Sequence, residues 1–252
     1  MPRKQRLNQM VAAIVENTSL DVAVLAEMFD VSQATVRRDL ETLEQQRLVH
    51  RTHGGAMTHA SFHDMPLSYK SAQDLTEKRR IAQRARGLLD RARVIGMTGG
   101  TTVTEFARLL SGVEGLTVVT NALNIVTELA SNPRLRVFAA GGEVRGSSQE
   151  AVGPSAEAFL GGYNIDVAFL GVDGVDAKAG CTNYDPVGAR VNAMLLERAR
   201  VAAVLADATK ITRVALAPVC SMSEVDVLIT DSRADPAAVE AIRRRGCEVL
   251  CV

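Results

Sequence analysis

The chain has 252 residues, of which 47% are hydrophobic and 23% are charged, and its formal net charge at pH 7 is zero. This composition is ordinary for a folded globular protein and argues against a disordered chain. No apolar run reaches the roughly 20 residues that a membrane-spanning helix needs. The first residues, MPRK, lead into a polar stretch rather than a signal peptide. We therefore expect a cytoplasmic protein with no membrane partner.

The cysteines and histidines predict neither a metal site nor a disulfide framework. All four cysteines lie in the second half of the chain without a Cys-x-x-Cys pair, so we expect them to be small buried side chains. The histidines lie close together in one segment, but no cysteine or clear carboxylate cluster accompanies them. They are His50, His53, His59 and His63. We expect no bound metal and no cofactor.

Three short apolar stripes with a helical repeat open the chain. They are Leu7, Met10, Val11 and Ile14, then Val22, Leu25, Ala26 and Phe29, and then Val36, Leu40 and Leu43. Asp21 and Ser32 precede the second and third stripes, where each is a favoured helix cap. Because only a tight turn at residues 30–31 separates these two helices, the pattern predicts a helix-turn-helix.

The third predicted helix has a polar face opposite its buried stripe. A rotation of 100° per residue places Ala34 and Arg38 on that face, with Thr35 and Arg37 flanking them. Short side chains beside arginines suit a helix that enters the major groove, where arginine pairs with guanine edges or phosphates. A solvated charged face is the alternative interpretation of the same residues.

Residues 48–56, LVHRTHGGA, are typical of a short strand followed by a Gly-Gly turn, the outline of a β-wing. Arg51 and the neighbouring imidazoles are placed to contact phosphates beside the groove. The first 57 residues carry as many acidic as basic residues. Binding to nucleic acid is therefore predicted from the positions of the cations and not from the net charge.

This part of the sequence resembles the DeoR-type family of bacterial repressors of sugar metabolism. The matching residues are Arg6, Met10, Ile14, Leu25, Ala26, Val31, Ser32, residues 35–40 (TVRRDL), Leu43, Glu44 and residues 53–56 (HGGA). In that family the matching helix recognises operator DNA. The resemblance therefore implies contacts to double-stranded DNA from Ser32, Gln33, Thr35, Arg37 and Arg38, with Arg51 and His53 as additional contacts from the wing.

The remainder predicts an α/β domain. Residues 58–74 have little periodicity and are interpreted as a linker between a winged helix-turn-helix, residues 1–57, and a domain of residues 75–252. Near-continuous apolar runs then alternate with helical stretches. The runs are residues 93–97, 116–120, 135–138, 166–170, 201–205 and 225–229. Such strands predict a parallel sheet covered on both faces, a Rossmann-like fold with ligands at the carboxyl ends of the strands.

Unusual residues collect at these strand ends. Residues 98–102, TGGTT, lead into a helix, and glycines, hydroxyls and free helix amides together can hold a phosphate. A plain strand-to-helix turn is the alternative. Other strand ends carry Asn121, Asp173 and Lys210. One crevice with a phosphate cradle, a lysine and carboxylates suits a phosphorylated sugar or polyol. The predicted effector site is Thr98, Gly99, Gly100, Thr101, Thr102, Thr120, Asn121, Gly141, Gly142, Asp173, Arg190 and Lys210.

The family resemblance extends through this second domain. It is carried by Glu77, Lys78, Ile81, Ala82, residues 99–102, Thr120, Asn121, Gly141, Gly142, Gly153, residues 171–174, Met194, Asp207, Lys210, Thr230 and Asp231. The resemblance implies a domain similar to ribose-5-phosphate isomerase that binds phosphorylated intermediates and thereby alters operator affinity. Thr98 stands where family members often have an acidic residue, and residues 186–190 (PVGAR) replace an acidic helix start. We expect both differences to retune ligand choice, with Arg190 adding a cation.

Two functions follow from these predictions. The first is a repressor of a sugar or polyol catabolic operon, a homodimer or homotetramer whose operator affinity responds to a sugar phosphate. The alternative is an isomerase-type enzyme with Asp173 as base and Lys210 as phosphate anchor. Proton abstraction also needs a second acid or base near the Met194 helix, and the sequence offers none there. We therefore expect a regulator and not an enzyme, with no catalytic residues.

Overall fold

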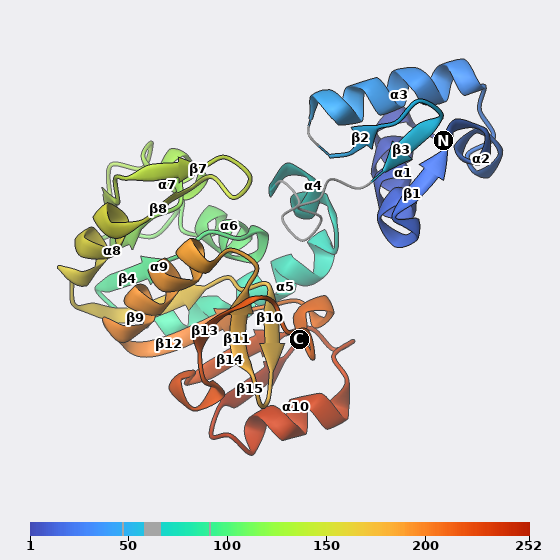
Figure 1. Cartoon of the computed structure of the whole chain (residues 1–252). Coiled ribbons are helices and arrows are strands. Elements are labelled where there is room, and N and C mark those ends of the chain that lie inside the picture. The colour runs from blue at the N-terminus through green and yellow to red at the C-terminus, as the bar shows by residue number, and fades with distance from the viewer. Residues whose placement is uncertain (47, 58–66, 91) are drawn as a thin grey trace. The chain divides into compact units, whose positions relative to one another are not determined.

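The computed structural model describes residues 1–46, 48–57, 67–90 and 92–252. The chain divides into two compact units, Met1–Tyr69 and Lys70–Val252 (Figure 1). Within the described residues, no helix is long and apolar enough to cross a lipid bilayer.

The N-terminal unit is a winged helix-turn-helix, as predicted. Its elements are α1 (Arg3–Asn17), β1 (Ser19–Asp21), α2 (Val22–Met28), α3 (Gln33–Gln45), β2 (His50–Arg51) and β3 (Gly55–Met57). The three predicted apolar stripes supply its core, in which Met10, Ile14 and Leu25 are fully buried. The Ser32 hydroxyl accepts a hydrogen bond from the amide of Thr35 and caps α3 as predicted, whereas Asp21 occupies the cap position of α2 without a side-chain bond.

The sequence did not predict β1, which completes the wing. β3 pairs antiparallel with β2 on one side and with β1 on the other, so that the strand order is β1-β3-β2. A strand of three residues shows no measurable alternation of apolar and polar residues. Its pairing with a segment more than thirty residues away leaves no local signal in the sequence.

A helix lies within the segment that we interpreted as a linker. The helix α4 (Leu67–Ala72) is followed by α5 (Leu75–Ala85) and by the 3₁₀ turn η1 (Arg86–Leu89). Asp74 joins α4 to α5 and has a φ of 48°, in the left-handed region that aspartate and asparagine tolerate best among non-glycine residues. Residues 58–66, the rest of the predicted linker up to α4, lie outside the described residues.

The C-terminal unit is built on a seven-stranded parallel sheet. Its strands, in spatial order, are β15 (Glu248–Cys251), β14 (Val227–Thr230), β12 (Ala199–Leu205), β9 (Ile165–Leu170), β4 (Val94–Met97), β5 (Thr117–Thr120) and β6 (Arg136–Ala139). The six predicted strands are all present within a residue or two of their expected ends. The edge strand β15 was missed, because only part of its short run is apolar.

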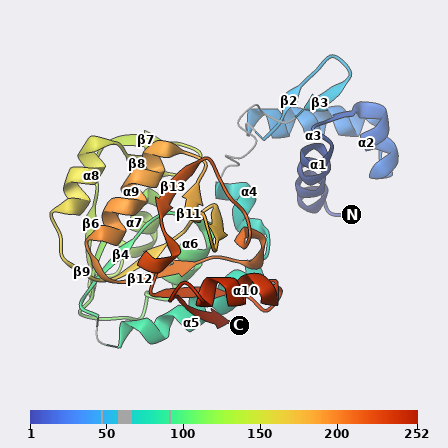
Figure 2. The ribbon, with the colours of Figure 1, turned by 60° about the horizontal axis from the view of Figure 1, so that its bottom comes forward.

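Helices cover both faces of this sheet (Figure 1 and Figure 2). One core lies between the sheet and α5, α6 (Thr101–Arg108) and α7 (Leu123–Leu129), where Phe106 packs on Phe169 with ring centroids 4.3 Å apart. The other lies against α8 (Pro154–Gly161), α9 (Pro186–Glu197) and α10 (Pro236–Arg243). Neighbouring residues of one strand, Ala168 and Phe169, belong to opposite cores, as the strand's side-chain alternation requires.

Two small antiparallel sheets were not predicted. The hairpin of β7 (Glu143–Arg145) and β8 (Glu150–Val152) follows β6. The second sheet joins β10 (Gly174–Asp176), β11 (Gly180–Asn183) and β13 (Ala217–Cys220). The short turns η2 (Ala208–Lys210) and η3 (Met222–Glu224) complete the unit. Both sheets start near the carboxyl ends of the parallel strands, so their residues can contribute to a site there.

Candidate functional site

In the N-terminal unit, α3 has one buried and one exposed face. Val36, Leu40 and Leu43 lie in the core, whereas Arg37 and Arg38 are exposed. Of the other residues predicted to contact DNA, Gln33 and Ser32 are exposed and Thr35 is half-buried. The Arg37 guanidinium lies 3.4 Å from Oε1 of Gln33, and among the described residues the Arg38 guanidinium has no hydrogen-bond partner. The arginines therefore project from a helix that its own core holds in place.

A buried carboxylate fixes α3 to α1. Asp39 is 1% exposed, and its two oxygens accept hydrogen bonds from Nε of Arg3 at 3.1 Å and Nε of Arg6 at 2.8 Å. Because a buried charge without a partner is costly, this triad constrains the relative position of the two helices. In the sequence, Asp39 was named only within the family signature of residues 35–40 and was given no role. Its spacing from Val36 and Leu43 is that of one helix face, which agrees with its burial.

The wing presents the two further residues that the family resemblance implies. Arg51 and His53 are both exposed, in β2 and in the turn that follows it. The amide of Arg51 donates a hydrogen bond to Oε1 of Glu44, which ties the wing to the end of α3. The exposed arginines of α3 and the wing thus belong to one small unit with a common core.

In the C-terminal unit, the strand order reverses between β4 and β9. From β4 the chain proceeds outward through β5 and β6, and from β9 it proceeds outward in the other direction through β12 and β14. In sheets of this kind, the usual ligand site lies at the carboxyl ends of the strands beside the point of reversal, where the loops that follow β4 and β9 begin. These loops are residues 98–100 and 171–173. The strand order thus places Gly99, Gly100 and Asp173, three predicted site residues, at the expected position.

The two loops approach each other closely. The hydroxyl of Thr98 is buried and accepts a hydrogen bond from the amide of Gly171 at 2.9 Å. A Cβ atom on Gly171 would lie 2.4 Å from the carbonyl oxygen of Gly99, so only glycine permits this approach. Thr98 is therefore engaged in holding the loops together. Thr101 and Thr102 open α6, whose first amides have no partner inside the helix.

A carboxylate that sequence analysis did not select contacts this loop. Oε1 of Glu150, in β8, accepts a hydrogen bond from the amide of Gly99 at 2.8 Å. A Cβ atom on Gly99 would lie 2.5 Å from the carboxyl carbon of Glu150. Burial raises the pKa of Glu150, and the bond from Gly99 partly offsets this rise. The predicted phosphate loop is thus lined on one side by an acidic side chain.

Asn121 lies beside Glu150 and is 1% exposed. Its amide nitrogen donates to the carbonyl of Ala151 at 3.1 Å and lies 3.4 Å from Oε1 of Glu150. Among the described residues, its side-chain oxygen accepts no hydrogen bond. A buried acceptor without a donor is unfavourable, so this oxygen is suited to a hydroxyl group of a ligand.

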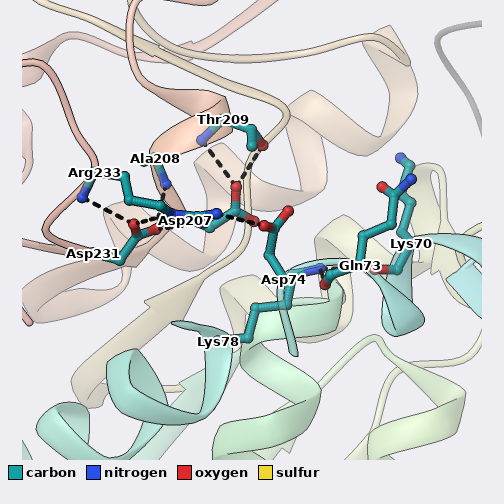
Figure 3. A network of polar contacts seen from close by, with 9 residues as sticks. All are labelled: Lys70, Gln73, Asp74, Lys78, Asp207, Ala208, Thr209, Asp231 and Arg233. Atoms are coloured by element: carbon teal, nitrogen blue, oxygen red, sulfur yellow. Dashed lines mark hydrogen bonds and ion pairs between the residues drawn. The ribbon is translucent and has the colours of Figure 1, made fainter. Parts of the chain in front are cut away.

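Lys210 is the last residue of η2, which follows β12. Burial lowers the pKa of its ammonium group, and the nearby Lys70 lowers it further, while Asp207 and Asp173 oppose the shift. Among the described residues, the Lys210 ammonium makes no ion pair or hydrogen bond. The Asp207 carboxylate caps η2 by accepting from the amide of Thr209 (Figure 3). A half-buried cation without a direct counter-charge is a natural site for an anion.

The other predicted site residues have different surroundings. The Thr120 hydroxyl donates to the carbonyl of Met97 at 2.7 Å and is fully buried, so it joins β5 to β4. Gly141 and Gly142 are exposed at the start of the β7–β8 hairpin. Arg190 is exposed on α9 and lies 3.2 Å from a carboxylate oxygen of Glu157 on α8. The structure therefore shows no contact of Arg190 with Lys210 or Asp173.

The cysteines and histidines are placed as follows. The four cysteines are free thiols, of which Cys181 and Cys247 are buried, Cys220 is half-buried and Cys251 is exposed. No three potential metal ligands come together in the part of the chain that the structure describes. His59 and His63 lie outside that part.

Comparison with known protein families identifies both units. Residues 6–62 match the DeoR-like helix-turn-helix domain, and residues 73–232 match the DeoR C-terminal sensor domain. The chain belongs to the DeoR family. The winged helix-turn-helix and the predicted family are thereby confirmed.

Relatives of similar length support this assignment. The chain is 32% identical to the HTH-type transcriptional regulator GlpR of Haloferax volcanii over 98% of its own length and 96% of that protein. It is 30% identical to a putative aga operon transcriptional repressor of Escherichia coli, over 98% of this chain and 93% of that one. It is also 30% identical to the glycerol-3-phosphate regulon repressor of Escherichia coli, over 92% of each chain. This DeoR protein is a DNA-binding transcriptional regulator and not an enzyme.

Among solved structures, the chain is similar to a ribose-5-phosphate isomerase in complex with phospho-erythronic acid. The TM-score is 0.39 at 18% identity, and the match covers 53% of this chain and 52% of that one. A TM-score this low adds nothing to the family assignment, which rests on the two matched family domains and on the relatives.

Proposed function

We propose that this DeoR protein represses a sugar or polyol catabolic operon and that a phosphorylated sugar or polyol, bound at the carboxyl ends of β4, β9 and β12, weakens its operator binding. The observation that carries the effector class is Lys210. Its half-buried ammonium lacks a direct counter-charge and lies near a second ammonium, that of Lys70. A phosphate supplies the missing negative charge, and the first amides of α6 offer it hydrogen bonds.

Hydroxyl groups of the effector have partners beside these strand ends. The unpartnered oxygen of Asn121 accepts from a hydroxyl, and the carboxylates of Glu150 and Asp173 can do the same. The Gly99 amide already donates to Glu150, so it is not available to a phosphate. We therefore place the phosphate nearer to Lys210 and Thr101 and the polyol carbons nearer to Asn121.

On the DNA side, α3 supplies the recognition helix. Arg37 and Arg38 are exposed and held on a helix that Asp39 anchors, so they can reach guanine edges or phosphates in the major groove. Arg51 and His53 then contact the backbone from the wing. One such helix covers few base pairs. We infer a homodimer or homotetramer that acts on a palindromic operator in the cytoplasm, where DNA and phosphorylated metabolites occur together.

A gel-shift titration with the promoter region upstream of the protein's own gene tests this function. The protein is expected to give a salt-sensitive, sequence-specific band, and a panel of phosphorylated sugars and polyols is screened for release of that band. The unphosphorylated compounds serve as matched controls. The proposed DNA-binding role is wrong if no specific band forms. The proposed effector class is wrong if unphosphorylated sugars release the band and their phosphates do not.

A further inference from the structure

Two cysteines face each other in the small sheet of β10, β11 and β13. In the antiparallel register of β11 and β13, Cys181 is the direct partner of Cys220. Directly opposed residues of such a pair extend to the same face of the sheet, with their Cβ atoms about 4.5–5.5 Å apart. The Cβ atoms of a disulfide are about 3.5–4.5 Å apart. Only a small approach of the two strands therefore separates this pair of thiols from a disulfide.

The backbones of the two strands are already close at this point. Gly180, which precedes Cys181, has a φ of 76°, a conformation that glycine adopts without strain. A Cβ atom on Gly180 would lie 2.0 Å from the carbonyl oxygen of Cys220. The register of the two strands shifts between Cys181 and Thr182. Because such an irregularity interrupts the ladder of hydrogen bonds, the backbone beside the pair has room to adjust.

The two thiols differ in their access to solvent. Cys181 is 0% exposed, and its Sγ lies 4.0 Å from Sδ of Met222. Cys220, at the end of β13, is half-buried. A third thiol, that of Cys247 before β15, is buried near them. A small solute therefore reaches Cys220 first, and the Cys181 sulfur lies behind it.

The electrostatics of the pair agree with this order. A hydrogen bond between the two thiols lowers the pKa of Cys220, against the opposing effects of burial and the Glu224 carboxylate. The same hydrogen bond and burial raise the pKa of Cys181. Burial raises the pKa of Cys247 to about 11. Since the thiolate is the reactive form of cysteine, Cys220 is the nucleophile of the group and Cys181 keeps its proton.

We propose that Cys220 and Cys181 are a redox-sensitive clamp, which hydrogen peroxide closes as a disulfide between β13 and β11. The Cys220 thiolate attacks one peroxide oxygen, so that an S–O bond forms, the O–O bond breaks and hydroxide leaves. Cys220 is then a sulfenic acid. The Cys181 sulfur attacks the Cys220 sulfur, the S–O bond breaks and water leaves, while the Cys181 proton neutralises the hydroxide. Two thiols are oxidised, and one peroxide is reduced to two waters.

The clamp acts on the part of the sheet that holds the loop after β9. The amide of Asp173 donates a hydrogen bond to the carbonyl of Thr182, the neighbour of Cys181, at 3.1 Å. The hydroxyl of Thr182 accepts from the amide of Ala215 at 2.8 Å. A covalent bond at Cys181 therefore restrains the loop that contains Asp173. This inference goes beyond the proposed function, and its tests need neither the operator nor the effector.

The bond itself is tested by mass spectrometry of the full-length protein. The reduced protein is treated with hydrogen peroxide, its remaining thiols are alkylated, and its peptides are mapped. The wild type is expected to lose two hydrogen atoms and to yield one linked pair of peptides, those of Cys181 and Cys220. In Cys181→Ala the reaction is expected to stop at a Cys220 sulfenic acid, which dimedone traps. Cys251→Ser removes an exposed thiol as the matched control and is expected to form the bond as the wild type does.

Two results of this experiment overturn the proposal. In one, the wild type forms no bond within the chain. In the other, the bond joins Cys220 to Cys247 and leaves Cys181 free. A Cys181→Ala protein without trapped sulfenic acid at Cys220 overturns the assignment of Cys220 as the nucleophile.

The clamp is tested by amide hydrogen exchange of the reduced and the oxidised protein. The disulfide is expected to slow exchange at the Asp173 amide and along β11 roughly tenfold or more, because it suppresses the opening of the sheet. The amides of α3, in the other unit, serve as an internal reference and are expected to keep their rates. Peroxide-treated Cys220→Ser is expected to exchange as its untreated form does. A disulfide that leaves exchange at Asp173 unchanged overturns the clamp.

Discussion

Replacement of Asp39 by asparagine tests how the recognition helix is held. The substitution keeps the size of the side chain but removes the charge that pairs with Arg3 and Arg6. The Arg6 side chain is only 13% exposed, so its charged hydrogen bond is expected to contribute about 1.5–3 kcal/mol. Arg3 is 59% exposed, and solvent screening limits its contribution to less than about 1 kcal/mol. The expected loss of stability is about 2–3 kcal/mol.

Amide hydrogen exchange measures this loss in the N-terminal unit without interference from the larger unit. A loss of 2–3 kcal/mol corresponds to exchange of the core amides of α1 and α3 that is roughly 30 to 150 times faster. Glu41→Gln removes an exposed carboxylate from the same helix, and it is expected to change exchange rates less than about twofold. Operator affinity is expected to fall in Asp39→Asn because α3 is less firmly placed. Equal exchange in the two variants would refute the anchoring role of Asp39.

Three further predictions concern the two sites. Arg38→Ala is expected to cost roughly 1–3 kcal/mol in operator binding if the arginine contacts a base, and a gel shift checks this beside an inorganic phosphate titration that should remain unchanged. Gly99→Ala is expected to lower stability by about 1–3 kcal/mol, since the new Cβ meets the Glu150 carboxyl at 2.5 Å; denaturant unfolding that matches the wild type would contradict the contact. Burial makes the pKa of Glu150 higher in the folded protein than in the unfolded chain, where it has its ordinary value of 4.5. The contribution of Glu150 to the free energy of unfolding is therefore complete below pH 4.5, and it is lost as pH rises through the folded pKa. Denaturation from pH 4 to pH 7 should show a smaller decline in Glu150→Gln than in the wild type.

The local periodicity of apolar residues was sufficient to predict those helices and strands in which the apolar pattern repeats strongly. The stripes of α1, α2 and α3 predicted the helix-turn-helix, and Ser32 marked the start of α3 because its hydroxyl satisfies a free amide there. Apolar runs located six strands of the parallel sheet. The sequence could not reveal β7, β8 and β10, which are three residues long and are stabilised by partners across a turn or a sheet.

The candidate site was only partly predictable for a related reason. Gly99, Asp173 and Lys210 follow strands, and the carboxyl ends of parallel strands lie on one edge, so strand prediction alone brought them together. Glu150 reaches Gly99 from a hairpin that was not predicted. Arg190 was assigned to the site by its place in the sequence, but its side chain lies on α9 beside Glu157. The orientation of α9 about its own axis decides which residues Arg190 contacts. The family resemblance does not predict this contact, because the chain departs from the family pattern at this position.

Lys70 contacts Asp173, and the sequence could not predict this contact. The lysine falls within residues 58–74, which have little periodicity, and its contact with Asp173 spans 103 positions. Lys78, by contrast, belongs to the family signature and is buried, although it touches no predicted site residue directly among the described residues. Its ammonium instead holds the carbonyl of Lys70. A buried lysine is costly unless its protons are used, and here they satisfy the carbonyl oxygens of Lys70 and Gln73 at the end of α4 (Figure 3). The burial of Lys78 is therefore explained by the hydrogen bonds that it donates to the end of α4.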